Sequence, residues 1–328
     1  MSTGPTGTER AVLGPGSVTE LRSFLDAYTV QVLGSPIADV RFRAGRIDAV
    51  WGVVLGDGRA VVIKANRQPV DLSALGAARE AQEVLVAAGF PCPEPLSGPD
   101  QVEGRVLTAE VMLTEGDAAD GRTPADRRLL AEGLAQHIDL LRGRPALLRG
   151  TGAGPSWCRY QDGPWPVPHD PIVDFRSTPA GYAWLDSYAE RASNQVLSYR
   201  NPDELVVGHA DWYGGNAAVA GGELVATFDW ELVAEDEAVI AGFAAACYAA
   251  SPTSGAGLSN PEQAIAFLRD YDVARGVALT HHQQRAAAGA TAWILAFNAR
   301  WEIGLPAGEG ATTELVRERQ ADFLDLSW

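Results

Sequence analysis

The sequence predicts an α+β protein of two lobes, in which a small antiparallel sheet with one helix precedes a larger, mainly helical lobe. Two observations predict the first lobe. Strand-like runs follow one another at 40–42, 49–55 and 59–65, and a Gly-Asp-Gly turn typical of hairpins joins the last two. A third observation predicts the second lobe, because helical patterns dominate beyond residue 123 and only 205–231 interrupts them with strand character. The 328 residues are enough for a core in each lobe.

The N-terminal elements can be predicted in order. Residues 1–16 are expected to form a disordered lead. A helix is predicted to start after Ser17, because Glu20 three residues later completes the pattern of a capping box. An alanine-rich helix is predicted over 71–89, where the final glycine is suited to end it. The proline-rich segment that follows is incompatible with a helix and leads to a further strand at 106–113.

A turn-rich linker then separates the lobes, so that we expect an N-terminal lobe over 17–113 and a C-terminal lobe over 114–328. An amphipathic helix is predicted to begin at Pro124, a residue suited to a first helical turn. A long irregular loop rich in Gly, Pro and Trp is expected over 150–178. Further helices are predicted at 180–198, 236–250, 261–275 and 280–303.

Composition limits the partners of the chain. The formal net charge of −16 disfavours nucleic acid and anionic membranes, which both require basic surfaces, and is compatible with a cationic substrate. No apolar run is long enough to span a bilayer, and the first residues lack the pattern of a signal peptide. Three widely separated cysteines argue against a disulfide framework and a cysteine-based zinc site. A cytoplasmic location is therefore expected.

One residue type is unusually rare. The 26 basic residues comprise 25 arginines and a single lysine, Lys64, at the end of a β-branched strand. Arginine cannot replace lysine where a compact ammonium must make a point contact in a confined space. Lys64 is therefore a candidate functional residue.

The segment 206–231, "VVGHADWYGGNAAVAGGELVATFDWE", holds the densest set of polar residues. Two apolar runs on either side of a glycine pair predict a hairpin. Its open end is expected to gather five polar residues: His209, Asp211, Asn216, Asp229 and Glu231. Because side chains alternate along a strand, Asp229 and Glu231 are expected to project the same way. An asparagine oxygen beside a carboxylate offers the hard ligands that suit Mg²⁺, and a nearby aspartate is placed to accept a proton from an attacking hydroxyl.

The spacing of His209, Asp211 and Asn216 is that of the protein-kinase catalytic loop, H-x-D-x-x-x-x-N, and Phe228-Asp229-Trp230-Glu231 follows the hairpin. In these motifs the chain resembles the aminoglycoside phosphotransferase and choline kinase family of small-molecule kinases, over roughly residues 44–243. Ala210 stands where that family usually has Gly or Arg, and the phosphate-covering loop lacks the G-x-G-x-x-G pattern. The resemblance implies a two-lobed, protein-kinase-like fold.

It also implies an enzyme that transfers the γ-phosphate of ATP to a hydroxyl of a small molecule, with Mg²⁺ as cofactor and GTP not excluded. Asp211 would be the catalytic residue that orients the hydroxyl and accepts its proton. Asn216 and Asp229 would be the metal ligands. His209 is expected to support the loop by hydrogen bonds rather than to donate a proton, and Glu231 to support the metal or the substrate.

The same resemblance assigns the nucleotide to residues of the N-terminal lobe. Lys64 would contact the nucleotide phosphates, and Glu80 would hold the lysine, with Glu83 one turn later as the second choice. The segment 109–116 occupies the place of the hinge strand that receives the adenine, so Glu110 and Met112 are candidate nucleotide contacts.

The acceptor is left open among aminoglycosides, other basic antibiotics, amino sugars, choline-like amino alcohols and neutral sugars. Trp212 and Tyr213 are candidate substrate contacts because they lie inside the catalytic loop. Glu235 in the acidic run 235–237, or Glu302, would be able to hold an ammonium group, but a solvated face is the preferred interpretation of each. Trp301 is a further candidate, although its helical spacing with other aromatic residues is typical of a core. A monomer or a homodimer is expected.

Two rival hypotheses remain. The facial triad of an iron-dependent oxygenase consists of two histidines and one carboxylate, and the sequence contains these residue types at His209, Asp211 and either His281 or His282. That triad usually lies in a jelly roll, whereas 281–299 has a helical pattern, and the oxygenase hypothesis leaves Lys64 unexplained. The second rival is a nucleotide-binding pseudokinase, but no expected catalytic residue is missing from the sequence.

Overall fold

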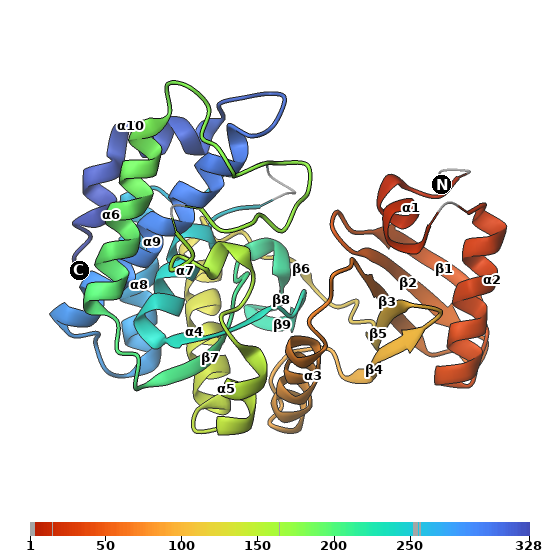
Figure 1. The fold of residues 1–328 in the computed structure, drawn as a ribbon. Coiled ribbons are helices and arrows are strands. Elements are labelled where there is room, and N and C mark those ends of the chain that lie inside the picture. Colours follow the sequence, from red (N-terminus) through yellow and green to blue (C-terminus); the bar gives the residue numbers. More distant parts are fainter. Residues whose placement is uncertain (1–3, 15, 164, 252–254, 256) are drawn as a thin grey trace. The chain divides into compact units, whose positions relative to one another are not determined.

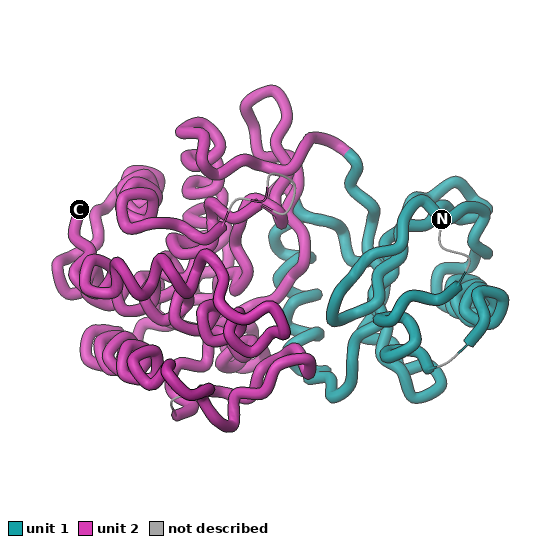
Figure 2. Tube along the Cα trace, turned by 90° about the horizontal axis from the view of Figure 1, so that it is seen from above, with its two compact units in different colours: residues 1–87, 92–114 teal, residues 88–91, 115–328 magenta. Residues whose placement is uncertain are grey.

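The structure of the protein is a computed structural model that describes residues 4–14, 16–163, 165–251, 255 and 257–328 (Figure 1). The chain divides into two compact units (Figure 2). Unit 1 comprises residues 1–87 and 92–114, and unit 2 comprises residues 88–91 and 115–328. The lobe boundary expected after residue 113 lies next to this division. The predicted classes are confirmed, since unit 1 is built on an antiparallel sheet and unit 2 is mainly helical.

Unit 1 holds a five-stranded antiparallel sheet in the order β1-β2-β3-β5-β4, together with three helices. A π-helical turn at Thr29–Leu33 continues the second helix. The elements of unit 1 are, in chain order, α1 (Gly7–Leu13), α2 (Val18–Tyr28), β1 (Ile37–Ala44), β2 (Ala49–Leu55), β3 (Ala60–Asn66), α3 (Leu72–Ala87), β4 (Pro95–Val102) and β5 (Arg105–Val111).

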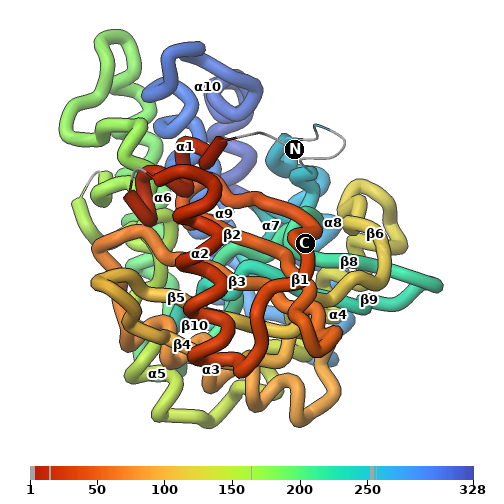
Figure 3. The backbone as a smooth tube through the Cα atoms, turned by 90° about the vertical axis from the view of Figure 1, so that its right-hand side faces the viewer, coloured from red at the N-terminus to blue at the C-terminus, as the bar shows by residue number. Residues whose placement is uncertain are grey.

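Helices α1 and α2 lie on one face of this sheet (Figures 1 and 3). Helix α2 begins with the predicted capping box between Ser17 and Glu20, and its residues Leu25 and Tyr28 are buried. They join a core with alternate residues of the central strands, of which Ile63 is completely buried. Because strand side chains alternate between faces, the neighbour Lys64 points away from this core.

Strand β4 was not expected, because its segment contains Pro95 and Pro99. A proline cannot donate a hydrogen bond to a neighbouring strand, so prolines are confined to the edges of sheets. Strand β4 is the last strand of the order and pairs only with β5, with register shifts on both sides of Ser97. The edge position explains how a proline-rich segment joins the sheet.

The expectation of a disordered lead over 1–16 is wrong for part of it, since Gly7–Leu13 forms helix α1. Thr6 and Glu9 form a capping box at its start. The Glu9 side chain is 2% exposed and accepts hydrogen bonds from Arg43 Nε and Trp51 Nε1, each at 2.8 Å. This interaction depends on partners far along the chain, so no local pattern could reveal it.

Unit 2 contains seven helices longer than one 3₁₀ turn among the described residues, and two small sheets. Its elements are, in chain order, β6 (Asp117–Ala118), α4 (Pro124–Leu141), α5 (Pro145–Thr151), α6 (Ala183–Tyr199), β7 (Leu205–His209), β8 (Ala217–Ala220), β9 (Glu223–Thr227), β10 (Leu232–Asp236), α7 (Glu237–Cys247), α8 (Pro261–Arg275), α9 (His281–Glu302) and α10 (Ala311–Leu324).

Helix α9 is the centre of unit 2 and packs against α6, α7 and α10. Both α7 and α9 are rich in alanine, which allows their backbones to approach closely: a Cβ at Gly242 would lie 2.3 Å from the carbonyl oxygen of Ala287. Helix α10 and strand β10 were not expected. No helix of the described residues is long and apolar enough to cross a membrane.

Helix α4 packs on the loop that follows β7. The indole of Trp212 donates a hydrogen bond to the carbonyl oxygen of Leu130 at 2.9 Å. A Cβ at Gly133, in the next turn, would lie 2.6 Å from Leu224 Cδ2 and 3.0 Å from Trp212 Cζ2. A glycine at this helical position therefore leaves the space that Trp212 occupies.

The Glu9 interaction predicts a pH-dependent contribution to stability. Burial alone would raise the pKa of Glu9, but hydrogen bonds from Arg43, Thr6 and Trp51 together hold it below its ordinary value. A lowered pKa in the folded state stabilises the fold above the ordinary pKa of 4.5, and this contribution is lost as the pH falls through the lowered value. Glu9→Gln should reduce the free energy of unfolding at pH 7 by roughly 3 kcal/mol, because Arg43 loses its charged partner.

Urea denaturation at pH 7 and pH 4 checks this prediction. The control is Glu103→Gln, since Glu103 is an exposed glutamate paired with Arg105, and its replacement should change stability by less than about 0.5 kcal/mol. Equal effects of the two substitutions would contradict the importance of Glu9.

The packing at Gly133 predicts the sign of a second substitution. Gly133→Ala should destabilise the protein by roughly 1 kcal/mol, because overpacking against Trp212 outweighs the gain in helix propensity. Gly76→Ala in α3 is the matched control, since a Cβ there meets nothing within 4 Å, and it should stabilise the protein by roughly 0.5–1 kcal/mol. Denaturation midpoints measure both effects, and a stabilising Gly133→Ala would refute the packing argument.

Candidate active site

The segment 206–231 forms the strands and the hairpin that the sequence predicts. Strand β8 pairs with β9, and the turn between them falls at Gly221 and Gly222, which both have positive φ. Strand β7 pairs instead with β10, so that His209 lies opposite Leu232. The end of β7 and the open end of the hairpin carry the five candidate residues.

His209 connects the end of β7 with the open end of the hairpin. Its ring is 1% exposed, its Nε2 donates to the carbonyl oxygen of Phe228 at 3.0 Å, and its Nδ1 accepts from the backbone N–H of Asp211 at 3.2 Å. Such a pair of bonds requires a neutral ring with its hydrogen on Nε2. His209 therefore ties the backbone at Asp211 to the residue that precedes Asp229.

Asp211 and Asn216 lie in direct contact. The side-chain nitrogen of Asn216 donates to Asp211 Oδ2 at 2.8 Å and to the Asp211 carbonyl oxygen at 3.0 Å. The backbone of Asn216 is fixed as well, because its carbonyl oxygen accepts from Phe228 N at 2.8 Å. With the amide nitrogen turned toward Asp211, the amide oxygen of Asn216 is directed away from that carboxylate.

Asp229 is exposed and has a φ of 55°, in the left-handed region that few residues other than glycine adopt. Strand β9 ends at Thr227, so the alternation expected for Asp229 and Glu231 does not apply to them. Glu231 is instead fixed through its backbone, donating to the Asp229 carbonyl oxygen at 2.9 Å and accepting from Ala210 N at 2.7 Å. A left-handed aspartate held in this way is a form of local strain that clusters at functional sites.

The donor set fits a magnesium ion. In the part of the chain that the structure describes, no three His, Cys, Asp or Glu side chains are grouped for a metal ion. Such grouping is not required for Mg²⁺, which is commonly held by one or two protein oxygens together with water and phosphate oxygens. The amide oxygen of Asn216 and the carboxylate of Asp229 have the right chemistry.

The iron triad has no support in this fold. His281 and His282 begin α9, where the His282 ring packs edge-on against Tyr199 with ring centroids 5.1 Å apart. A helical lobe of this kind is not the jelly roll in which that triad usually lies.

Two of the candidate substrate contacts belong to the catalytic loop and differ in their environment. Trp212 is 3% exposed and belongs to the core, because its indole packs on α4, and its contact with a substrate stays a prediction. Tyr213 is half-buried, and burial together with the nearby carboxylates of Asp211 and Asp229 raises its pKa to about 12. Its hydroxyl thus stays protonated close to both candidate carboxylates.

Glu235 is not available for a substrate ammonium. Its side chain is 4% exposed, and its Oε2 accepts from Tyr160 Oη at 2.7 Å and from Arg200 Nη1 at 2.8 Å. The preferred interpretation, a solvated face, is wrong, because β10 inserts the acidic run into the interior. Glu302 is also used internally, since its carboxylate accepts from the backbone N–H groups of Thr312 and Thr313 at the start of α10.

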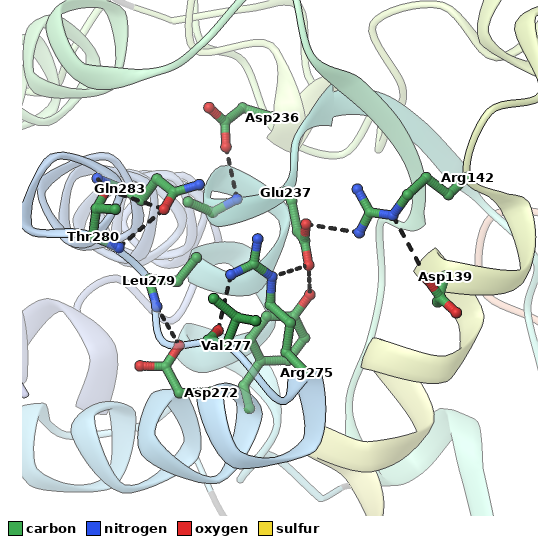
Figure 4. A network of polar contacts seen from close by, with 12 residues as sticks. Asp139, Arg142, Asp236, Glu237, Asp272, Arg275, Val277, Leu279, Thr280 and Gln283 are labelled. Atoms are coloured by element: carbon green, nitrogen blue, oxygen red, sulfur yellow. Dashed lines mark hydrogen bonds and ion pairs between the residues drawn. The ribbon is translucent and has the colours of Figure 1, made fainter.

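The other members of the acidic run are buried too, and Figure 4 shows their polar contacts. Asp236 caps α7 by accepting from Ala238 N at 2.7 Å. Glu237 accepts from Arg142 Nη2 at 2.8 Å, Arg275 Nε at 2.7 Å and a tyrosine hydroxyl at 2.9 Å. A pocket of about 540 Å³ adjoins this network, and none of the candidate catalytic residues lines it.

Trp301 lies in the last turn of α9 and is half-buried. Its contact with a substrate stays a prediction.

Lys64 lies on the central strand β3, opposite Val50 and Thr108. Its Nζ forms an ion pair with Asp48 Oδ2 at 3.2 Å, and Asp48 Oδ1 accepts from the backbone N–H of Arg67 at 2.8 Å. Sequence reasoning missed Asp48, which precedes β2 directly. The hairpin pattern was the available signal, since it places the start of β2 beside the end of β3.

The other expected nucleotide contacts are spread over unit 1. Glu80 is exposed on α3, and among the described residues it forms no ion pair with Lys64. Glu110 Oε2 accepts from Gln82 Nε2 at 3.0 Å, which links β5 to α3. The backbone N–H of Met112 donates to the Ala60 carbonyl oxygen at 3.0 Å. Their roles toward a nucleotide stay predictions.

Two further residues support the catalytic loop and were missed. The Trp157 indole donates to the Ala210 carbonyl oxygen at 3.1 Å from a segment expected only to be irregular. His137 packs beside His209 from helix α4, with ring centroids 6.3 Å apart. The signal for His137 was a lone histidine on the apolar face of a predicted helix.

Solved structures of similar fold include small-molecule kinases. The amicoumacin kinase hAmiN, in complex with AMP-PNP, Ca²⁺ and Ami, is 12% identical with a TM-score of 0.59, over 94% of this chain and 96% of that one. Macrolide 2'-phosphotransferase type I is 16% identical with a TM-score of 0.55, over 95% and 98% of the two chains. A thermostable mutant of aminoglycoside phosphotransferase APH(4)-Ia, in a ternary complex with ADP and hygromycin B, is 14% identical with a TM-score of 0.51, over 91% and 94% of the two chains.

Among curated proteins, none matches the chain significantly. A family model does: that of the phosphotransferase enzyme family (APH) matches residues 39–240, more than half of the 328 residues. The match includes β3 with Lys64 and the whole segment from His209 to Glu231. The chain therefore belongs to the phosphotransferase enzyme family.

Proposed function

We propose that this phosphotransferase moves the γ-phosphoryl group of ATP to a hydroxyl group of a small molecule and requires Mg²⁺. One observation carries the proposal: the Asp211 carboxylate is held by the side chain of Asn216 at the end of a buried strand, and His209 ties this loop to the turn at Asp229. A carboxylate fixed in this way suits a group that must orient an attacking hydroxyl.

In the proposed step the acceptor oxygen forms a bond to the γ-phosphorus, and the bond from that phosphorus to the bridging oxygen of ADP breaks. The Asp211 carboxylate orients the hydroxyl and takes its proton, so that the charge of the attacking oxygen does not build up. The bond between Asn216 and Asp211 Oδ2 limits the rotation of the carboxylate, which supports this orienting role.

Asn216 and Asp229 would hold the magnesium ion, which when bound offsets the negative charge of the phosphates. Lys64 would contact the nucleotide phosphates, with Asp48 as the anion that fixes its ammonium group. Glu80 keeps its assignment as a residue of the nucleotide site, and Glu110 and Met112 keep theirs near the base. The ADP and the AMP-PNP with Ca²⁺ in two similar structures support a nucleotide and a divalent cation, with GTP as the alternative nucleotide.

For the acceptor we propose a cationic molecule such as an aminoglycoside, another basic antibiotic or an amino sugar. The net charge of −16 favours such a partner, and hygromycin B and amicoumacin are bound by structures of the same fold. Tyr213 and Trp301 remain the proposed substrate contacts, and Glu231 a supporting residue. A neutral sugar or an amino alcohol is the alternative acceptor.

Coupled measurement of ADP release tests the reaction. With Mg·ATP and a panel of aminoglycosides, macrolides, amicoumacin, amino sugars, neutral sugars and amino alcohols, we expect turnover on at least one cationic member. Omission of Mg²⁺ should abolish that turnover. No turnover on any member, together with no measurable binding of Mg·ATP, would overturn the proposed function.

A single substitution tests the base. Asp211→Asn should lower kcat by about 10³-fold or more, because the amide still fits beside Asn216 but cannot accept the proton. Binding of Mg·AMP-PNP, followed by calorimetry, should stay within about twofold, since Asp211 is not assigned to the nucleotide or the metal. An Asp211→Asn variant with normal kcat would show that another group accepts the proton.

A further inference from the structure

His137 has an unusual place in unit 2. It lies in the middle of α4, is completely buried, and neither of its ring nitrogens has a hydrogen-bond partner among the described residues. Its ring lies within 5.5–6.3 Å, between centroids, of four other aromatic rings, which are Phe90, His209, Trp212 and Trp230. We call these five side chains the aromatic cluster.

Stability alone does not explain a histidine at this position. A polar ring buried without hydrogen bonds costs free energy that an apolar side chain of similar shape would avoid. Burial, and to a smaller extent the neighbouring His209, lowers the pKa of His137 to about 3, so the ring is neutral at ordinary pH. The reason for a histidine at this position must therefore lie in the shape of its ring and in the contacts that the ring makes.

Those contacts lead to the candidate catalytic residues. His137 stacks on Trp230, the residue between Asp229 and Glu231, with ring planes 19° apart. It meets His209, which holds Asp211 N and the Phe228 carbonyl oxygen. The ring of His137 contacts every other member of the aromatic cluster.

We propose that His137 is a positioning residue that holds His209 and Trp230 in place from α4, and thereby fixes Asp211 relative to Asp229. This inference rests on the proposed function, because it assigns catalysis to Asp211 and metal binding to Asp229. The flat ring of His137 packs against both Trp230 and His209, which also contact each other, and a smaller side chain would let both rings move. The loop at Asp211 and the turn at Asp229 would then shift together.

The experiment compares His137→Ala with Leu141→Ala, a buried leucine one turn later on the same helix and outside the aromatic cluster. Both truncations should lower Tm, because each leaves a cavity. Only His137→Ala should lower kcat strongly, by about tenfold to a hundredfold, since a small displacement of reacting groups is costly. Only His137→Ala should also weaken Mn²⁺ binding in the presence of AMP-PNP, by about tenfold, because Asp229 moves with Trp230.

Addition of free imidazole gives a readout that a purely structural role would not move. Imidazole should enter the cavity of His137→Ala and raise kcat at least threefold, with no effect on Leu141→Ala. His137→Leu replaces His137→Ala if the smaller variant does not fold, and it should show the same losses because it cannot stack on Trp230.

Two results would overturn the inference. One is a folded His137 variant with the kcat and Mn²⁺ affinity of the original protein, and the other is equal losses in the His137 and Leu141 variants. Failure of the proposed function is distinguishable, because it removes turnover from the unsubstituted protein on every acceptor. Where the unsubstituted protein binds the nucleotide without turnover, the Mn²⁺ affinities with AMP-PNP still decide whether His137 positions Asp229.

Discussion

The two hydrogen bonds of His209 are the interaction on which the candidate active site depends. One holds the backbone at Asp211 and the other holds the residue before Asp229, so a single neutral ring sets the separation of two loops. The surrounding structure keeps that ring in place: β10 pairs with β7, and the aromatic cluster packs around the imidazole. The lobe thus holds Asp211 and Asp229 in fixed positions although they follow strands of two different sheets.

The parts of the molecule that could be predicted are those governed by local patterns. The strands at 49–55 and the hairpin after His209 follow from apolar runs separated by glycine turns, and their observed bounds lie within a residue or two of the predicted ones. Asp211 and Asn216 are five residues apart, so their contact also lies within one short segment. The family match then supports the fold and reaction class that this segment indicates.

The parts that could not be predicted depend on partners far along the chain. Glu235 looks like a surface acid until Arg200 and Tyr160 are placed beside it, and Glu9 looks like part of a flexible lead until Trp51 and Arg43 cover it. Trp212 looked like a substrate contact because it lies inside the catalytic loop, yet α4 buries it. In an acidic chain, sequence alone cannot separate acids that stabilise the fold from acids that face a ligand.

The rarity of lysine has a practical consequence. Because Lys64 carries the only side-chain amine of the protein, an amine-directed reagent can modify a single side chain besides the α-amino group. The Lys64 side chain is about a quarter exposed and its ammonium is paired with Asp48, so the reactivity of the amine reports on that ion pair and on any group that competes for it. Counting added labels by mass spectrometry would therefore follow the occupancy of one position on β3 without any engineered probe.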